Sequence, residues 1–414
     1  MSIDQILSSA ETRIQAHRTA EVALRLTGPN GQPLPRAEVE IALTRHTFKL
    51  GANAFHVGGI ESLTLREGYE ERFAALLNYA TLPFYWGGYE PEPGRTNERR
   101  LEAMADWCAQ QRITSKGHPL AWHEVFPAWA SALDDAEVLR RQHARVNTIV
   151  AQFKGRIDIW DVVNEATVSA NFDNAIGRWI AREGAVSCVA QALTWAREAN
   201  PSATLLYNDF NISPAFEQVC AGLVERRAPI DVIGIQSHMH KGTWPIERAW
   251  AVCETYARFG LPLHFTELTV LSGRLKAADD NDWHFVHADW RSTAEGEAAQ
   301  LDYGSRLYTL LFSHPAVEAI TWWDFADYGA WQGAPAGLLR KDMTPKPLYD
   351  WLMDAFHRRW TTRARITADD AGCVSLRTFY GDYAVTARLP SGDVLRGQCS
   401  ITRSTQAGLI VTLA

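Results

Sequence analysis

The chain has 414 residues, a formal net charge of −7 at pH 7 and 46% hydrophobic residues. That length allows one large domain of ~250–300 residues beside a smaller one, and the hydrophobic content supports a large folded core. The sequence has no basic block and no apolar run near the ~18 residues of a membrane helix, so we expect neither nucleic acid nor a membrane as partner.

Residues 1–46 predict a short helix followed by two β-strands. The start, "MSIDQILSSAETRIQ", lacks the basic region and the long apolar stretch of a signal peptide, so we expect a helix there. The sequence leaves two compartments open. The protein is either cytoplasmic, or secreted or periplasmic with its signal peptide removed. The runs "AEVALRLTG" and "AEVEIALTRH" alternate apolar and polar residues around the turn-forming "PNGQPLP", as strands do.

Residues 47–357 alternate short apolar strands with amphipathic helices. The strand candidates are 48–55, 78–86, 113–118, 157–164, 204–209, 231–238, 262–267 and 318–325. Helical stretches include 98–111, 136–152, 176–199, 295–313 and 346–357. These units predict an α/β fold, a (β/α)8 TIM barrel with insertions. A doubly wound open sheet is the alternative, but the sequence has no glycine-rich nucleotide motif to support it.

Residues 358–414 return to strands, with "VSLRTF", "GDYAVTARL", "VLRGQCSI" and "GLIVTLA" separated by Gly, Pro and Asp. Residues 1–46 show the same pattern of short alternating strands separated by turn residues, so we expect the two ends to form one small β-sandwich accessory domain. The run "LRTFYGDYAV" (376–385) predicts a tight aromatic hairpin within it. The six cysteines have no C-x-x-C spacing and are expected to be free thiols, with a Cys373–Cys399 pair as the alternative.

Polar residues stand at the C-terminal ends of the predicted barrel strands. In a barrel these ends meet at one mouth, which is where catalytic side chains lie. Any one of them alone is explained as a capping or loop residue, but together they indicate a shared site. They are His118, Asn164, Glu165, Asn208, Asp209, Gln236, His238, Glu267, Asp324 and Asp327.

Two of these residues are glutamates: Glu165 after the fourth strand and Glu267 at the end of the seventh. A carboxylate at the end of a buried strand is unfavourable unless it is paired or used in chemistry. Two facing carboxyl groups suit cleavage of a glycosidic bond, because one protonates the leaving oxygen while the other attacks or activates water. A structural ion pair with Arg or Lys is the alternative. The sixteen tryptophans favour a sugar site, since sugar rings stack on flat apolar faces, although an aromatic core also explains them.

Six motifs resemble glycoside hydrolase family 10, the family of β-1,4-xylanases. They occur in the family's order: "GHPLAWH" (117–123), "WDVVNEA" (160–166), "LYNDFN" (206–211), "IGIQSHM" (233–239), "LHFTEL" (263–268) and "PKPLYD" (345–350). The resemblance covers about residues 48–357. It implies a (β/α)8 barrel and a retaining mechanism, with Glu165 as acid/base and Glu267 as nucleophile.

The same matching implies the residues that line the reacting sugar. His238 would hold the nucleophile in place, and Trp323 and Trp331 in "ITWWDFADYGAW" resemble the two tryptophans that wall the family's sugar site. The matching also implies contacts from His118, Trp122, Asn164 and Gln236, and we further expect contacts from Trp86 and Tyr85 at the end of the second strand.

The chain departs from the family where sugar hydroxyls are bound. Family members carry Glu-Asn-x-Met-Lys-Trp at the end of the second strand, and this chain has "TLPFYW" (81–86). Thr81, Leu82 and Tyr85 therefore replace Glu, Asn and Lys, a loss of hydrogen-bonding partners worth on the order of several kcal/mol. Tyr85 offers a ring or a hydroxyl instead. Lys116 also replaces an Arg, and Thr269 replaces an Asp.

The sequence thus predicts a monomeric retaining β-glycoside hydrolase that cleaves β-1,4-xylan or xylo-oligosaccharides without a metal or other cofactor. One alternative is a retaining β-glycosidase for another β-glycan or for decorated or aryl glycosides, and another is a non-catalytic carbohydrate-binding barrel. A metal-dependent hydrolase is disfavoured because the first strand has no His-x-His, although His118 with His123 and His238 with His240 resemble ligand pairs. Residues 271–292 are expected either to shape the leaving-group side or to form a mobile surface loop.

Overall fold

The computed structural model describes residues 3–405 and 408–414 and divides the chain into two compact units. The larger unit comprises Leu50–Tyr308 and Ala316–Tyr349. The smaller unit combines the N-terminal segment up to Lys49 with Thr309–Pro315 and the segment from Asp350 onward. No helix in the described part of the chain is long and apolar enough to cross a membrane.

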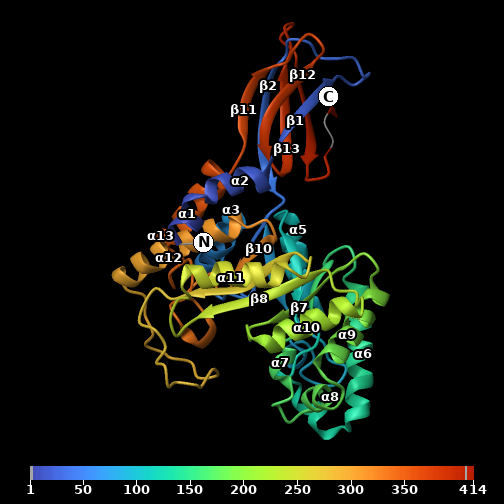
Figure 1. The fold of residues 1–414 in the computed structure, drawn as a ribbon, viewed down its shortest axis with the longest axis vertical. Helices are drawn as coiled ribbons and strands as arrows, with labels where there is room; N and C mark the ends of the chain where they lie inside the picture. The colour runs from blue at the N-terminus through green and yellow to red at the C-terminus, as the bar shows by residue number, and fades with distance from the viewer. Residues whose placement is uncertain (1–2, 406–407) are drawn as a thin grey trace. The chain divides into compact units, whose positions relative to one another are not determined.

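Eight parallel strands close into a barrel, with helices in the connections between them (Figure 1). Each strand pairs with the next along the chain, and β10 closes the barrel against β3. The strands are β3 (Lys49–Asn53), β4 (Tyr79–Pro83), β5 (Thr114–His118), β6 (Ile159–Asn164), β7 (Thr204–Asp209), β8 (Val232–Met239), β9 (Leu263–Val270) and β10 (Val317–Trp322). They fall within or beside the eight predicted strands, so the predicted (β/α)8 barrel is confirmed.

The barrel strands are buried on both faces. Every residue of β6 and β9 is buried, as expected for strands with the barrel interior on one side and helices on the other. Neighbouring strands approach closely at Gly117 in β5, where a Cβ atom would lie 2.1 Å from the ring of Trp160. Glycine at this position therefore lets the Trp160 ring pack against the backbone that leads into His118.

The helices are close to those predicted, with one difference. They are α3 (Leu63–Leu76), α4 (Trp86–Tyr89), α5 (Glu98–Gln110), α6 (Asp135–Gln152), α7 (Ala166–Ser169), α8 (Ala175–Glu183), α9 (Ala185–Ala199), α10 (Pro214–Glu225), α11 (Ile246–Ala257), α12 (Ala294–Ser313) and α13 (Pro347–Asp354), with short turns η1 (Ala128–Ala132), η2 (Trp331–Gly333) and η3 (Ala355–Arg359). The single helix predicted over 176–199 is wrong. Gly184 has a φ of 81°, which glycine adopts without strain, and it separates α8 from α9.

The smaller unit contains a β-sandwich built from both ends of the chain, as predicted. Helices α1 (Ile3–Ser8) and α2 (Ala10–Arg18) precede its first strand. Leu24 of the first sheet and Ile41 and Val385 of the second contribute to its buried apolar core. One sheet has the order β12 (Cys373–Phe379), β1 (Thr19–Thr27), β15 (Leu409–Thr412), and the other β11 (Arg363–Thr367), β2 (Glu38–His46), β13 (Gly381–Arg388), β14 (Val394–Ile401).

Two details of the sandwich differ from expectation, and a third agrees with it. The aromatic hairpin at 376–385 is wrong, because β12 pairs with β1 while β13 pairs with β2 and β14 in the other sheet. Strand β11 was not predicted, since its alternating arginines resemble a solvent-exposed linker. All six cysteines are free, as expected, and Cys373 and Cys399 do not form the alternative disulfide.

Candidate active site

Glu165 is the residue directly after β6, where the backbone leaves the barrel for α7. Its φ of 57° and ψ of 43° lie in the left-handed region, which is unfavourable for a residue with a Cβ atom. Its N–H donates to the carbonyl oxygen of Asn208 (2.8 Å), and its own carbonyl accepts from Ser169 Oγ (2.9 Å). Strained backbone held in this way is typical of functional positions.

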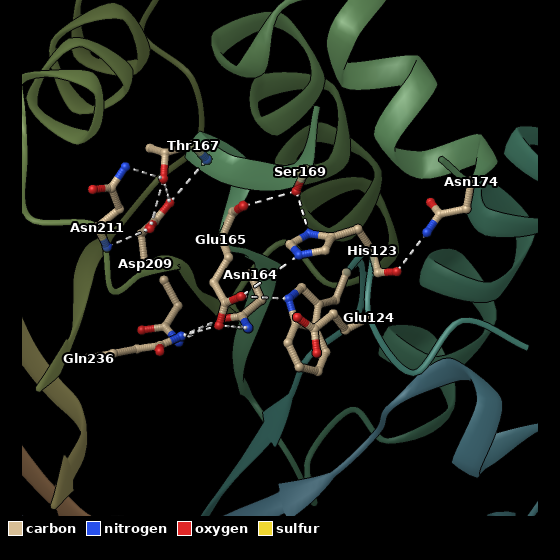
Figure 2. Close-up of polar contacts among 12 residues, drawn as sticks. His123, Glu124, Asn164, Glu165, Thr167, Ser169, Asn174, Asp209, Asn211 and Gln236 are labelled. Carbon is tan, nitrogen blue, oxygen red and sulfur yellow. Dashed lines mark hydrogen bonds and ion pairs between the residues drawn. The ribbon is translucent and has the colours of Figure 1, made fainter. Parts of the chain in front are cut away.

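Three side chains donate hydrogen bonds to the carboxyl group of Glu165. Asn164 Nδ2 and Gln236 Nε2 lie 3.0 and 2.9 Å from Oε1, and Trp122 Nε1 lies 3.0 Å from Oε2. Figure 2 shows the carboxyl group between Gln236 on one side and His123 on the other. Burial raises the pKa of Glu165 to about 8, against the opposing effect of the Gln236 and Trp122 bonds. Glu165 is therefore protonated at neutral pH.

Glu267 lies in β9, and the strand continues past it to Val270, so the prediction that Glu267 ends the strand is wrong. Asn208 Nδ2 donates to its Oε1 (2.7 Å), and His238 Nε2 lies 3.1 Å from its Oε2. Burial acts to raise the pKa of Glu267, but attraction to His118, the hydrogen bond with His238 and the charge of Lys116 together hold the pKa below its ordinary value. The two glutamates thus differ in protonation near neutral pH.

A chain of amide side chains connects the two glutamates. Asn208 Nδ2, which donates to Glu267, also donates to Asn164 Oδ1 (2.7 Å), and Asn164 in turn donates to Glu165. Gln236 Nε2 lies within reach of both Asn164 Oδ1 (3.1 Å) and Glu165. Thr266 Oγ1 donates to Asn208 Oδ1 (2.5 Å), which fixes the orientation of the Asn208 amide. Residues at the end of β6, at its junction with α7, near the end of β7 and within β8 and β9 therefore bring both carboxyl groups into one hydrogen-bond network.

A buried charged triad orients His118 toward Glu267. Lys116 Nζ and His118 Nδ1 lie 2.5 and 2.7 Å from the same oxygen, Asp161 Oδ2, and the side chains of Lys116 and Asp161 are fully buried. His118 Nδ1 therefore donates to Asp161, which turns Nε2 toward Glu267 Oε1 at 3.8 Å. Lys116, which stands where the resemblance implies an Arg, forms a buried ion pair with Asp161.

Removing Asp161 should destabilise the barrel strongly. Asp161→Ala leaves the ammonium group of Lys116 buried without a counter-charge, so we expect a loss of about 3–5 kcal/mol in the free energy of unfolding. Urea unfolding followed by tryptophan fluorescence measures the change. Glu92→Ala is the matched control, because the Glu92–Arg95 pair is 65% and 74% exposed and should contribute less than about 1 kcal/mol. Equal unfolding midpoints for the two variants would contradict the importance of the buried pair.

Aromatic rings surround the two glutamates. Tyr85 packs against His118 and Trp122, with ring centroids 5.4 and 5.5 Å apart. Trp323 packs against His118 at 5.4 Å, and Trp331 packs against His238 at 4.9 Å. The structure therefore brings Tyr85, Trp122, Trp323 and Trp331 together with both predicted histidines at one mouth of the barrel.

Trp86 lies among aromatic and charged side chains at the start of α4. It begins α4, and its described partners are Phe126, Trp129, the Arg145 guanidinium and Glu90, which accepts a hydrogen bond from Nε1 (3.0 Å). The replaced positions Thr81 and Leu82 are both completely buried in β4.

The segment 271–292 is anchored beside the aromatic wall. The ring of Trp283 stacks on Trp331, with centroids 5.8 Å apart and an interplanar angle of 20°. Gln332 Nε2 donates to the Trp283 carbonyl (3.0 Å), and buried Trp290 donates to the Arg274 carbonyl (2.8 Å). These contacts place the segment against η2, beside Trp331.

Sequence reasoning missed two residues of the network and one beside it. Asp161 and Thr266 support the two glutamates, and Glu124 follows His123 at the edge of the site. A lone carboxylate inside the apolar run "IWDVV" was a usable signal for Asp161, because such a group needs a buried partner. Asn208 was expected at the shared mouth as a polar strand end, and nothing in the sequence singled out Thr266 or Glu124.

The fold and the site together define a class of protein. A (β/α)8 barrel that carries a protonated and an ionised glutamate in one hydrogen-bond network, beside tryptophan rings, has the arrangement of a glycoside hydrolase active site. The sequence model of glycosyl hydrolase family 10 matches residues 70–355, and the chain belongs to that family.

Similar proteins support this assignment. Endo-1,4-beta-xylanase B of Thermotoga neapolitana is 30% identical over 279 residues, which cover 64% of this chain and 75% of that protein. The crystal structure of xylanase 10B from Thermotoga petrophila in complex with xylobiose superposes with a TM-score of 0.62 and 26% identity, over 75% of this chain and 95% of that one.

A third relative differs in its name and in its length. Anti-sigma-I factor RsgI6 of Acetivibrio thermocellus is 26% identical over 402 residues, which cover 93% of this chain. The chain spans 47% of the length of that protein.

Proposed function

We propose that the protein is a retaining β-glycoside hydrolase that cleaves β-1,4-xylan or xylo-oligosaccharides, with Glu165 as acid/base and Glu267 as nucleophile. The observation that carries this proposal is the opposite direction of the two pKa shifts, since one carboxyl group must donate a proton while the other stays ionised. The xylanases named above support xylan as the substrate class.

The mechanism follows from the positions of the two groups. Glu165 donates its proton to the glycosidic oxygen while ionised Glu267 attacks the anomeric carbon, so the leaving sugar departs and a glycosyl ester forms on Glu267. Glu165, now ionised, takes a proton from water, and that water cleaves the ester. Asn164 donates to the sugar hydroxyl next to the reacting carbon, and His238 and Asn208 hold Glu267 in its attacking position.

The pH dependence of kcat/KM should be bell-shaped. Hydrolysis needs protonated Glu165, so the rate falls as the pH rises through about 8, and it needs ionised Glu267, so the rate falls again at acid pH. Trp122→Phe removes a hydrogen bond that favours ionised Glu165, and it should move the alkaline limb to higher pH. An alkaline limb that persists unchanged in Glu165→Gln would contradict its assignment to Glu165.

A second candidate substrate class is a decorated or aryl β-glycoside. Two observations favour it: Thr81 and Leu82 offer little to sugar hydroxyls, and Tyr85 borders a cavity of about 230 Å³. The cavity is lined mainly by apolar groups, Phe55, Pro83, Tyr89 and Leu101 among them, with Asn97 and Arg100 as polar members. Such a cavity suits an apolar substituent on the sugar better than a further unsubstituted xylose.

A panel of aryl β-glycosides and polysaccharides, including xylan, tests the function. Release of xylo-oligosaccharides from xylan is the expected result. Hydrolysis of aryl or decorated glycosides without action on xylan would favour the second candidate. Binding of sugars with no hydrolysis of any substrate would leave the non-catalytic barrel as the explanation. Hydrolysis should persist in EDTA, since no step uses a metal.

A further inference from the structure

His123 is buried beside Glu165, and one of its ring nitrogens has no hydrogen-bond partner. The residue is 2% exposed. Its Nδ1 lies 2.6 Å from Ser169 Oγ, and the Ser169 hydroxyl donates to the carbonyl of Glu165, so Nδ1 carries the proton and donates to Ser169. Nε2 is left with a free lone pair, and it is buried without a partner.

The free nitrogen of His123 is aimed at the carboxyl group of Glu165. Nε2 lies 3.9 Å from Glu165 Oε2, which is too long for a hydrogen bond. Figure 2 shows the ring turned toward this carboxyl group, with the Glu124 side chain next to it. One ligand atom from each of His123, Glu124 and Glu165 lies within 4.8 Å of the others. Three potential metal ligands therefore converge on one point at the edge of the proposed active site.

We propose that His123, Glu124 and Glu165 form an inhibitory binding site for a divalent cation of the zinc class. One imidazole and two carboxylates are ligands that zinc accepts, at metal–ligand distances of about 2.0–2.2 Å. An imidazole ligand disfavours Mg²⁺ and Ca²⁺, which take oxygen ligands. The second ring nitrogen of His123 is already held by Ser169, as is usual for a metal-binding histidine.

The neighbouring groups suit both binding and inhibition. Because Ser169 holds Nδ1 of His123, the unpartnered Nε2 can offer its lone pair to a cation. Glu124 is only partly buried and opens the site to solvent. Zinc would bind the carboxyl oxygen of Glu165 that carries the proton for catalysis. That proton would be released to the solvent. The inhibitory effect rests on the proposed role of Glu165 as acid, whereas the binding of zinc does not.

Calorimetry with zinc chloride on the chelator-treated full chain tests the binding site. The expected result is one Zn²⁺ bound per chain, with binding at least about tenfold weaker in Glu124→Gln and unaffected by Mg²⁺. Glu92→Gln is the matched control, since its side chain is 65% exposed and it should bind zinc as the unaltered chain does. Equal zinc affinity in Glu124→Gln and Glu92→Gln, or no binding below millimolar zinc, would overturn the site.

Inhibition is measured separately, on each variant relative to its own metal-free rate. Zinc should inhibit hydrolysis by the unaltered chain, EDTA should restore the rate, and Glu124→Gln should need at least about tenfold more zinc for half inhibition. If zinc binds and no glycoside is hydrolysed, the proposed function fails while the site stands. If glycosides are hydrolysed and zinc does not bind, only the zinc site fails.

Discussion

Glu267→Ala should lower the rate of hydrolysis of an aryl β-glycoside by at least about 10⁴-fold, because the variant has no group to attack the anomeric carbon. The folded structure should persist, since the change removes a buried carboxylate and with it the free-energy cost of keeping that charge away from water. Sodium azide should then restore part of the activity. The small anion fits the space left by the carboxyl group and attacks the anomeric carbon from the same side, so the product is the glycosyl azide of inverted configuration.

A control separates this effect from a general loss of activity. Glu247→Ala removes an exposed glutamate from the first turn of α11 and should keep full activity with no response to azide. A folded Glu267→Ala variant that stays active, or one that azide does not rescue, would show that Glu267 is not the nucleophile.

Glu165→Gln should separate substrates by their leaving groups. A poor leaving group needs the proton of Glu165, so its hydrolysis should slow by about 10²–10⁴-fold. A dinitrophenyl leaving group departs without a proton, so formation of the glycosyl ester should be largely retained. Steady-state and burst kinetics on the two kinds of substrate measure the difference. Equal losses on both would contradict the role of Glu165 as acid.

Much of the barrel was predictable because its strands are short apolar runs bounded by polar residues. The exact place of Glu267 was not predictable. β9 continues to Val270 because Leu268–Val270 still pair with β8, where Val270 lies opposite Met239. The sequence of one strand does not reveal how far it pairs with its neighbour. The break at Gly184 was equally hidden, since glycine also occurs inside helices.

The sandwich shows a different limit of sequence reasoning. The runs at 374–379 and 381–389 are joined by a turn, and local patterning favours pairing them as a hairpin. The buried core instead separates them, because each strand presents its apolar side chains to the core from an opposite sheet. Only the packing of the whole unit decides between these outcomes.

The sequence predicted which residue types form the candidate site better than it predicted the hydrogen bonds and ion pairs between them. Glu165, Glu267 and the neighbouring histidines follow from motifs at strand ends. The supporting contacts depend on which side chains of adjacent strands point inward, as Lys116 and His118 do toward Asp161. Trp86 stays a predicted sugar contact, and its packing against Trp129 and its hydrogen bond to Glu90 could not be read from its motif.

The stereochemistry of the first product is the most direct test of the central claim that Glu165 and Glu267 act by double displacement. Proton NMR during hydrolysis of a β-glycoside records which anomer appears before mutarotation. A retaining enzyme, with carboxyl groups about 5–5.5 Å apart, should release the β-anomer first. First release of the α-anomer would mean direct attack by water and would contradict Glu267 as the nucleophile.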